Sequence, residues 1–108
     1  MNNHIPQLRY LGMISHPEHS EYGFQIENED KSVRMLVLTI ANAVFRTNQL
    51  MVQEAPDLCY QKVMTSLKGE TPDTIAALIP VTDSDIAYYR TIHPILKQQR
   101  KSFRKPAE

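Results

Sequence analysis

Hydrophobic and polar residues alternate in the first part of the chain, which is the pattern of β-strands. The clearest alternation covers residues 21–27, where every second residue is hydrophobic, namely Tyr22, Phe24 and Ile26. Residues 8–15 mix aromatic and aliphatic side chains and also predict a strand. The polar residues 16–20, which include Pro17, favour a turn between these two strands.

Residues 33–40 predict a third strand with apolar side chains on both faces. Because successive side chains of a strand point to opposite sides, one face carries Leu36, Leu38 and Ile40, and the other carries Val33, Met35 and Val37. Such a strand is normally covered twice. Besides the helices, two segments or partners could supply the second cover. Residues 78–81 can pair beside the strand, with Pro80 tolerated at a sheet edge, or another chain can meet its free edge and second face.

The second half of the chain changes to a helical period. The best helix covers residues 56–68, with Pro56 suited to the first helical position and Gly69 suited to the end. Its apolar stripe consists of Tyr60, Val63, Met64 and Leu67, with Cys59 at the edge and Leu58 on the opposite side. A sheet is expected beneath this stripe.

Shorter helices are expected on either side of this one. Residues 42–46 favour a helix with Asn42 as N-cap, and Thr71 to Asp73 resemble a helix start. Thr82 and Asp85 have the spacing of a capping box, and the helix that follows has a stripe of Ile86, Tyr89 and Ile92. The predicted fold class is therefore α+β, a three-stranded antiparallel meander followed by two or three helices, one of them packed on the sheet.

Length and composition predict one folded domain. The chain has 108 residues, of which 42% are hydrophobic and 22% charged, which is ordinary globular composition. The formal net charge is zero, but residues 97–108 carry five basic residues and one acidic residue. We interpret residues 1–96 as a single α+β domain and residues 97–108 as a basic, flexible tail.

The chain shows no sign of export or membrane insertion. Its first residues have neither a basic nor an apolar stretch of signal-peptide type, and no apolar run approaches about 18 residues. Cys59 is the single cysteine, so an intramolecular disulfide is excluded and a reducing compartment fits best. We expect a cytoplasmic protein.

His16 and His19 are the candidate metal ligands. They lie three residues apart in the predicted turn, beside Glu18 and Glu21, and imidazoles at that spacing can share a zinc or nickel ion. A real site needs three or four ligands, and the pattern indicates no convincing third one. A solvated loop is the favoured interpretation, and no cofactor is predicted.

Cys59 is the candidate nucleophile. It lies near the start of the best helix, where the helix dipole can lower the pKa of a thiol. No sequence signature for a resolving cysteine or a catalytic histidine accompanies it, so a packing role is favoured. The three glycines are far apart, which excludes a phosphate-cradling loop, and no nucleophile elbow or zincin motif occurs. A metal- or thiol-dependent enzyme is therefore the least favoured class.

The basic tail is the candidate contact for a polyanion. Its cations are Lys97, Arg100, Lys101, Arg104 and Lys105. They predict salt-sensitive binding to phosphates, which makes a nucleic-acid-associated regulator the alternative function. Only Phe103 is available as a stacking group, and the rest of the chain is acidic, so a solubilising tail is favoured.

Two segments are similar to parts of small uncharacterised bacterial proteins. They are Leu38-Thr39-Ile40-Ala41-Asn42-Ala43-Val44-Phe45 and Gln53-Glu54-Ala55-Pro56-Asp57-Leu58-Cys59. The resemblance implies a bacterial cytoplasmic origin and carries no site residues.

The leading hypothesis from the sequence is a non-catalytic protein-interaction or regulatory module. The third strand has more apolar surface than a small domain readily covers, so we expect a protein partner or a second copy of the chain against it. The candidate interaction residues are Met35, Val37, Leu36 and Leu38. No membrane and no small molecule is indicated as a partner.

Overall fold

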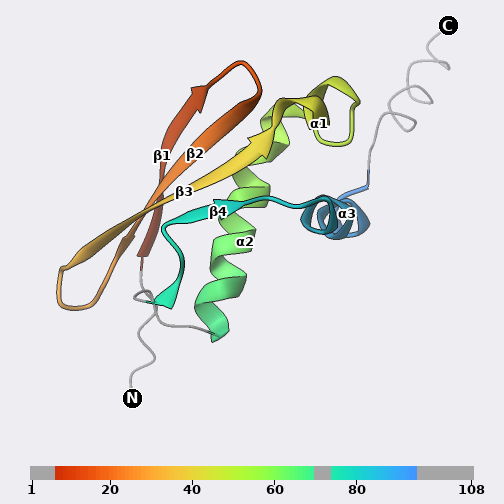
Figure 1. Ribbon diagram of the computed structural model, residues 1–108. Coiled ribbons are helices and arrows are strands. Elements are labelled where there is room, and N and C mark those ends of the chain that lie inside the picture. The colour runs from red at the N-terminus through yellow and green to blue at the C-terminus, as the bar shows by residue number, and fades with distance from the viewer. Residues whose placement is uncertain (1–6, 70–73, 95–108) are drawn as a thin grey trace, which may run out of the picture.

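A computed structural model describes residues 7–69 and 74–94, and these residues form a sheet with helices on one side (Figure 1). The elements in chain order are β1 (Gln7–Ser15), β2 (His19–Glu27), β3 (Val33–Ala41), α1 (Asn42–Arg46), the short 3-10 helix η1 (Val52–Glu54), α2 (Ala55–Gly69), β4 (Leu78–Pro80) and α3 (Asp83–Ile92). The predicted α+β class and the antiparallel meander are confirmed.

The sheet has four strands in the order β1-β2-β3-β4. The first three are antiparallel, and β4 pairs with β3 in parallel. The backbone N–H of Val37 donates to the carbonyl of Ala77 at 2.8 Å, and the N–H of Val81 donates to the carbonyl of Thr39 at 2.8 Å. Pro80 has no N–H to donate, which suits the outer edge that it occupies. The expectation that residues 78–81 pair beside the third strand is confirmed.

The core lies between one face of the sheet and the helices. Every second residue of β2 and β3 on this inner face is buried, namely Ser20, Tyr22, Phe24, Ile26, Leu36, Leu38 and Ile40. From α2, Leu58, Cys59 and Val63 join the same cluster, as do Ile86 and Tyr89 from α3. The β2 alternation therefore has the phase that the sequence predicts.

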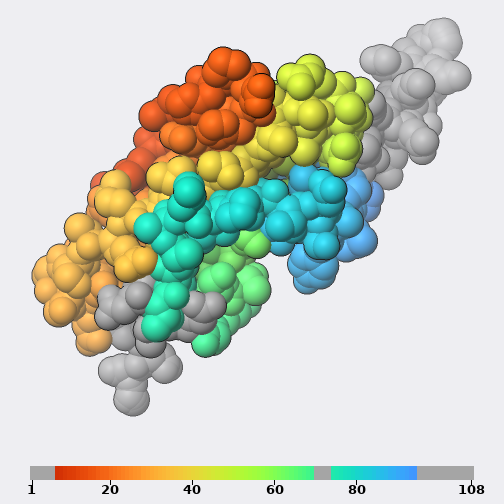
Figure 2. All heavy atoms as spheres, in the orientation of Figure 1, coloured from red at the N-terminus to blue at the C-terminus, as the bar shows by residue number. Residues whose placement is uncertain are grey.

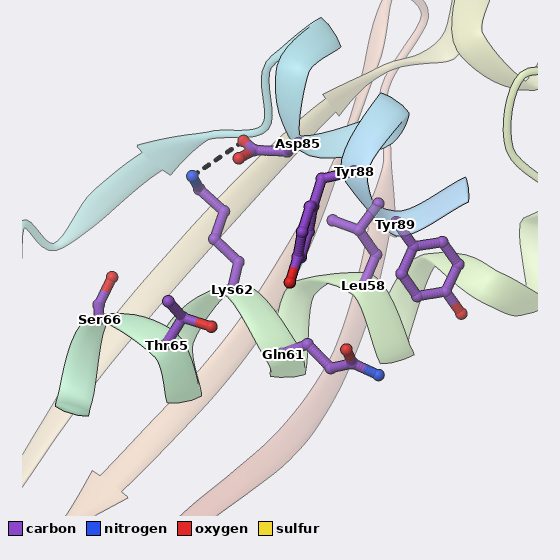
Figure 3. A pocket seen from close by; sticks show the side chains of 8 residues that line it. All are labelled: Leu58, Gln61, Lys62, Thr65, Ser66, Asp85, Tyr88 and Tyr89. Carbon is purple, nitrogen blue, oxygen red and sulfur yellow. Dashed lines mark ion pairs between the residues drawn. The ribbon is translucent and has the colours of Figure 1, made fainter. Parts of the chain in front are cut away.

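The predicted stripe of α2 is confirmed in part. Cys59 and Val63 are buried and Leu67 packs against the core, whereas Tyr60 is 40% exposed. Leu58, expected on the opposite side of the helix, is also buried, because the helix is covered a second time. The helix contacts both the sheet and α3, and Leu58 lies between α2 and α3 beside Tyr89 (Figure 3).

The predicted N-cap is confirmed for α3 and is wrong for α1. In α3, the Asp85 N–H donates to the Thr82 hydroxyl, and the Thr82 N–H donates to the Asp85 carboxylate at 2.8 Å, so the capping box is confirmed. In α1 the N-cap is Ala41, not Asn42. The side chain of Asn42 is already bonded to the turn before β2, so it does not cap the helix. The expected helix start at residues 71–73 lies outside the described residues.

Candidate functional site

The outer face of the sheet carries apolar side chains and is not covered by any described helix. Pairing aligns Gly12, Gly23, Val37 and Leu78 in one row across the four strands. Leu11 lies over Gly23, where a side-chain carbon would come within 3.8 Å of the Leu11 Cβ. Because Gly23 has no side chain, it leaves a shallow place on the outer face beside Leu11.

The exposed apolar residues of this face come from three strands. Their exposed fractions are 46% for Leu11, 61% for Ile14, 54% for Val33, 53% for Met35 and 63% for Leu78. In Figure 2, β3 and β4 lie in front of α2, so the view is onto this face. Several exposed apolar side chains on one face of a sheet are typical of contact sites.

The predicted interaction residues divide between the two faces. Leu36 is 1% exposed and Leu38 is fully buried in the chain's own core, so neither is accessible to a partner. Met35 and the half-buried Val37 lie on the outer face. Cover on both faces was expected for β3, but α2 covers its inner face only. No described segment covers Met35 on the outer face.

The edges of the sheet are less open than its outer face. At one edge, β4 is only three residues long and contains Pro80. At the other, β1 is interrupted by a bulge between Tyr10 and Gly12, and Gly12 has a φ of +135°. Bulges and prolines at edges hinder pairing with another strand. Contact through the face is therefore favoured over extension of the sheet.

Charged side chains accompany the apolar residues on the outer face. Arg9 of β1 pairs in register with Gln25, and Glu21 and Glu27 follow the same face of β2. The neighbouring imidazole of His16 is the largest influence on Glu21 and lowers the pKa of its carboxyl group. The face therefore has both signs of charge.

The two candidate metal ligands lie side by side. The rings of His16 and His19 are stacked with centroids 4.7 Å apart. Glu21 joins them, with its Oε1 3.4 Å from His16 Nε2 and its Oε2 3.5 Å from His19 Nε2. Glu21 is a neighbour of the histidines in the sequence but was not predicted as a third ligand, because the predicted turn ended at Ser20. β2 in fact begins at His19, and the i, i+2 spacing of a strand then puts His19 and Glu21 on one face.

The candidate nucleophile Cys59 is fully buried. Burial, together with the negative charge of Asp85, raises the pKa of its thiol to about 12. The neutral thiol is therefore the form present at neutral pH, and the side chain acts as a packed apolar group.

A cavity of about 190 Å³ lies between α2 and α3 (Figure 3). Its charged lining groups are Lys62 and Asp85, whose Nζ and Oδ2 atoms are 2.8 Å apart. Because this cation and this carboxylate already pair with each other, the cavity offers no free charge to orient a ligand.

The tyrosines of α3 have different surroundings. Tyr88 is 68% exposed at the cavity, whereas Tyr89 is 6% exposed and its hydroxyl donates to the Asp57 carboxylate at 2.8 Å. Arg90 forms two hydrogen bonds with Glu54, at 2.7 and 2.9 Å, which lower the pKa of the Glu54 carboxyl group. This guanidinium fastens α3 to η1 and is not free to bind a ligand.

Lys97, Arg100, Lys101, Arg104 and Lys105 lie outside the described residues, so the polyanion contact stays a prediction. Within residues 7–69 and 74–94, no helix combines the length and the apolar character needed to cross a membrane. No family model, curated protein or solved structure matches the chain.

Proposed function

We propose that this protein is a non-catalytic interaction module of the cytoplasm that self-associates through the outer face of its sheet. The observation that supports this most is the exposure of Leu11, Ile14, Met35 and Leu78 on one surface opposite the core. These side chains contribute little to folding of the single chain, because they remain in water. When these side chains are buried against another surface, the hydrophobic effect lowers the free energy of association.

A second copy of the chain is the occupant that fits best. Two-fold association places the same surface patch on both sides of the interface, so the apolar row of one copy meets that of the other. The face carries Arg9 as well as Glu21 and Glu27, so each copy offers a charge of opposite sign to the other. The formal net charge is zero, so two copies do not repel each other at long range.

Sedimentation of the full chain across micromolar concentrations tests the proposal. We expect a dimer that dissociates on dilution. Met35→Lys should raise the dissociation constant at least about tenfold, because a charge is then desolvated at the interface. Val52→Lys is the matched control, since Val52 is 60% exposed on η1, away from the face. It should leave the dissociation constant unchanged.

Two outcomes contradict the proposal. One is a wild-type chain that stays monomeric at every concentration tested. The other is a Met35→Lys dimer as tight as that of Val52→Lys, which would place the contact elsewhere. Circular dichroism of both variants checks that each retains the native fold.

A further inference from the structure

The histidine cluster at the β1–β2 turn has the geometry of a metal site. His16 lies in the turn, and His19 and Glu21 lie on the same face of β2. One donor atom from each of the three side chains falls within 4.8 Å of the others. The metal ions that suit these donors are those that accept imidazole nitrogen and carboxylate oxygen together as ligands.

The separations in the cluster suit coordination better than hydrogen bonding. The two nitrogen–oxygen distances, 3.4 and 3.5 Å, are longer than those of ordinary hydrogen bonds, which run from about 2.7 to 3.2 Å. Ligands about 2.1 Å from a tetrahedral zinc ion are roughly 3.4 Å from each other. Each of the two nitrogen–oxygen separations therefore matches one edge of a coordination tetrahedron, measured to a different oxygen of Glu21.

His16 adds an observation at the level of a single atom. The side chain is 38% exposed, but its Nε2 atom is shielded from solvent and, at 3.4 Å from Glu21 Oε1, makes no hydrogen bond of ordinary length with a described residue. A shielded polar nitrogen without a full hydrogen bond costs free energy, and an ion between it and Glu21 would satisfy it.

The backbone of the turn is held by hydrogen bonds to Asn42 and by one between the two histidines themselves. The Asn42 amide Nδ2 donates to the His16 carbonyl at 2.7 Å, and the Ser20 hydroxyl donates to Asn42 Oδ1 at 2.8 Å. The Asn42 N–H donates to the carbonyl of Glu18 at 3.0 Å, and the His16 N–H donates to the carbonyl of His19 at 2.8 Å. These bonds fix the chain between the two histidines, so little conformational entropy remains to be lost when a ligand binds.

We infer that His16, His19 and Glu21 bind one divalent transition-metal ion of the zinc class. The protein ligands are the two Nε2 atoms and a carboxylate oxygen, and water completes the coordination. Imidazole ligands favour zinc, nickel or copper over magnesium and calcium, which prefer oxygen. The ion cross-links the β1–β2 turn to β2 at one end of the outer face.

Calorimetric titration of the full chain with Zn²⁺ tests this inference. We expect one ion per chain and no binding of Mg²⁺. His16→Gln, His19→Gln and Glu21→Gln should each weaken Zn²⁺ binding at least about tenfold, since loss of one of three ligands leaves an incomplete site. Zinc should also raise the midpoint of thermal unfolding of the wild-type chain, because it binds only the folded turn.

The controls apply the same substitutions to side chains outside the cluster. Glu18→Gln changes a carboxylate in the same turn, and His93→Gln removes a histidine whose ring lies tilted against that of Tyr89, with centroids 4.4 Å apart. Both should bind Zn²⁺ as the wild-type chain does. Nitrogen NMR of the imidazole rings should show zinc-dependent shifts at Nε2 of His16 and His19 and none in His93.

The inference fails if the chain binds no Zn²⁺, or if Glu21→Gln binds it as tightly as Glu18→Gln. It does not rest on the proposed self-association, although Glu21 lies on the same outer face. The Met35→Lys variant keeps all three ligands and should bind Zn²⁺ with the wild-type affinity, whatever its oligomeric state.

Discussion

β3 carries apolar side chains on both faces of the sheet, but those on the inner face are buried and those on the outer face are exposed or half-buried. On the inner face, Leu38 is fully buried beneath α2, whereas on the outer face Met35 is 53% exposed. The alternation of a strand therefore separates the side chains into two sets without deciding which set forms the core. The helix decides it, and the remaining set is available for association.

The largest predicted effect contrasts Leu38→Ala with Met35→Ala. Leu38→Ala should lower the free energy of unfolding by about 3 kcal/mol, because it leaves a cavity in a packed core. Met35→Ala should cost less than about 1 kcal/mol in the monomer, where its side chain is half in water. Urea denaturation in dilute solution measures both. Equal costs would mean that the outer face is covered within the chain itself.

A smaller effect is predicted at the bulge that places Leu11 on the outer face. Gly12 has a φ of +135°, a conformation that residues with a side chain rarely adopt. Gly12→Ala should destabilise the fold by about 1 to 2 kcal/mol through backbone strain. No atom lies within 4 Å of the added carbon, so a steric clash is not the cause.

Gly69→Ala is the matched control for the bulge. It also has open space around the added carbon but no positive φ, and it ends α2. Thermal unfolding should show no loss of stability there. A similar loss at both glycines would remove the strain explanation.

The smallest predicted effect lies in the middle of the outer face. Gly23→Ala should stabilise the single chain by about 0.5 kcal/mol, because glycine within a strand carries an entropic cost. The added methyl group would meet Leu11 at 3.8 Å, an ordinary contact, and fill the shallow place at Gly23. The same change should weaken self-association, because the opposing surface no longer fits there. Sedimentation and thermal unfolding together measure the pair of effects, and tighter association would show that the shallow place is not part of the interface.

Local pattern was sufficient to predict most of the fold. The period of two identified β2 and the phase of its buried residues. Residues 78–81, with Pro80 tolerated at an edge, were one of two candidates for the cover of the third strand, and β4 lies within them. The element that covers Leu58, on the side of α2 opposite the stripe, could not be predicted, because this element is α3, which lies far away in the sequence. Such long-range packing leaves no mark on a single helix.

The candidate sites were less predictable for a related reason. Ser20 is small and polar, which is typical of a turn, but it is buried and its hydroxyl bonds to Asn42, 22 residues away. That tertiary contact extends β2 back to His19 and brings Glu21 into the histidine cluster. The exposure of Met35 could not be predicted either, because the hydrophobicity of the residue is the same whether it is covered or not.

Asn42 also has a consequence for strand alignment. Because β3 is apolar on both faces, hydrophobic burial alone discriminates poorly between the native pairing with β2 and one shifted by a residue, which would turn every side chain of β3 to the opposite face. The bonds from Asn42 to the His16 carbonyl and to Ser20 require Ala41 to lie opposite His19. In a shifted pairing they would be out of reach by about 3.3 Å, the rise of one residue. The side chain of Asn42 thus selects the register of β3, and the register determines which of its two apolar faces is buried.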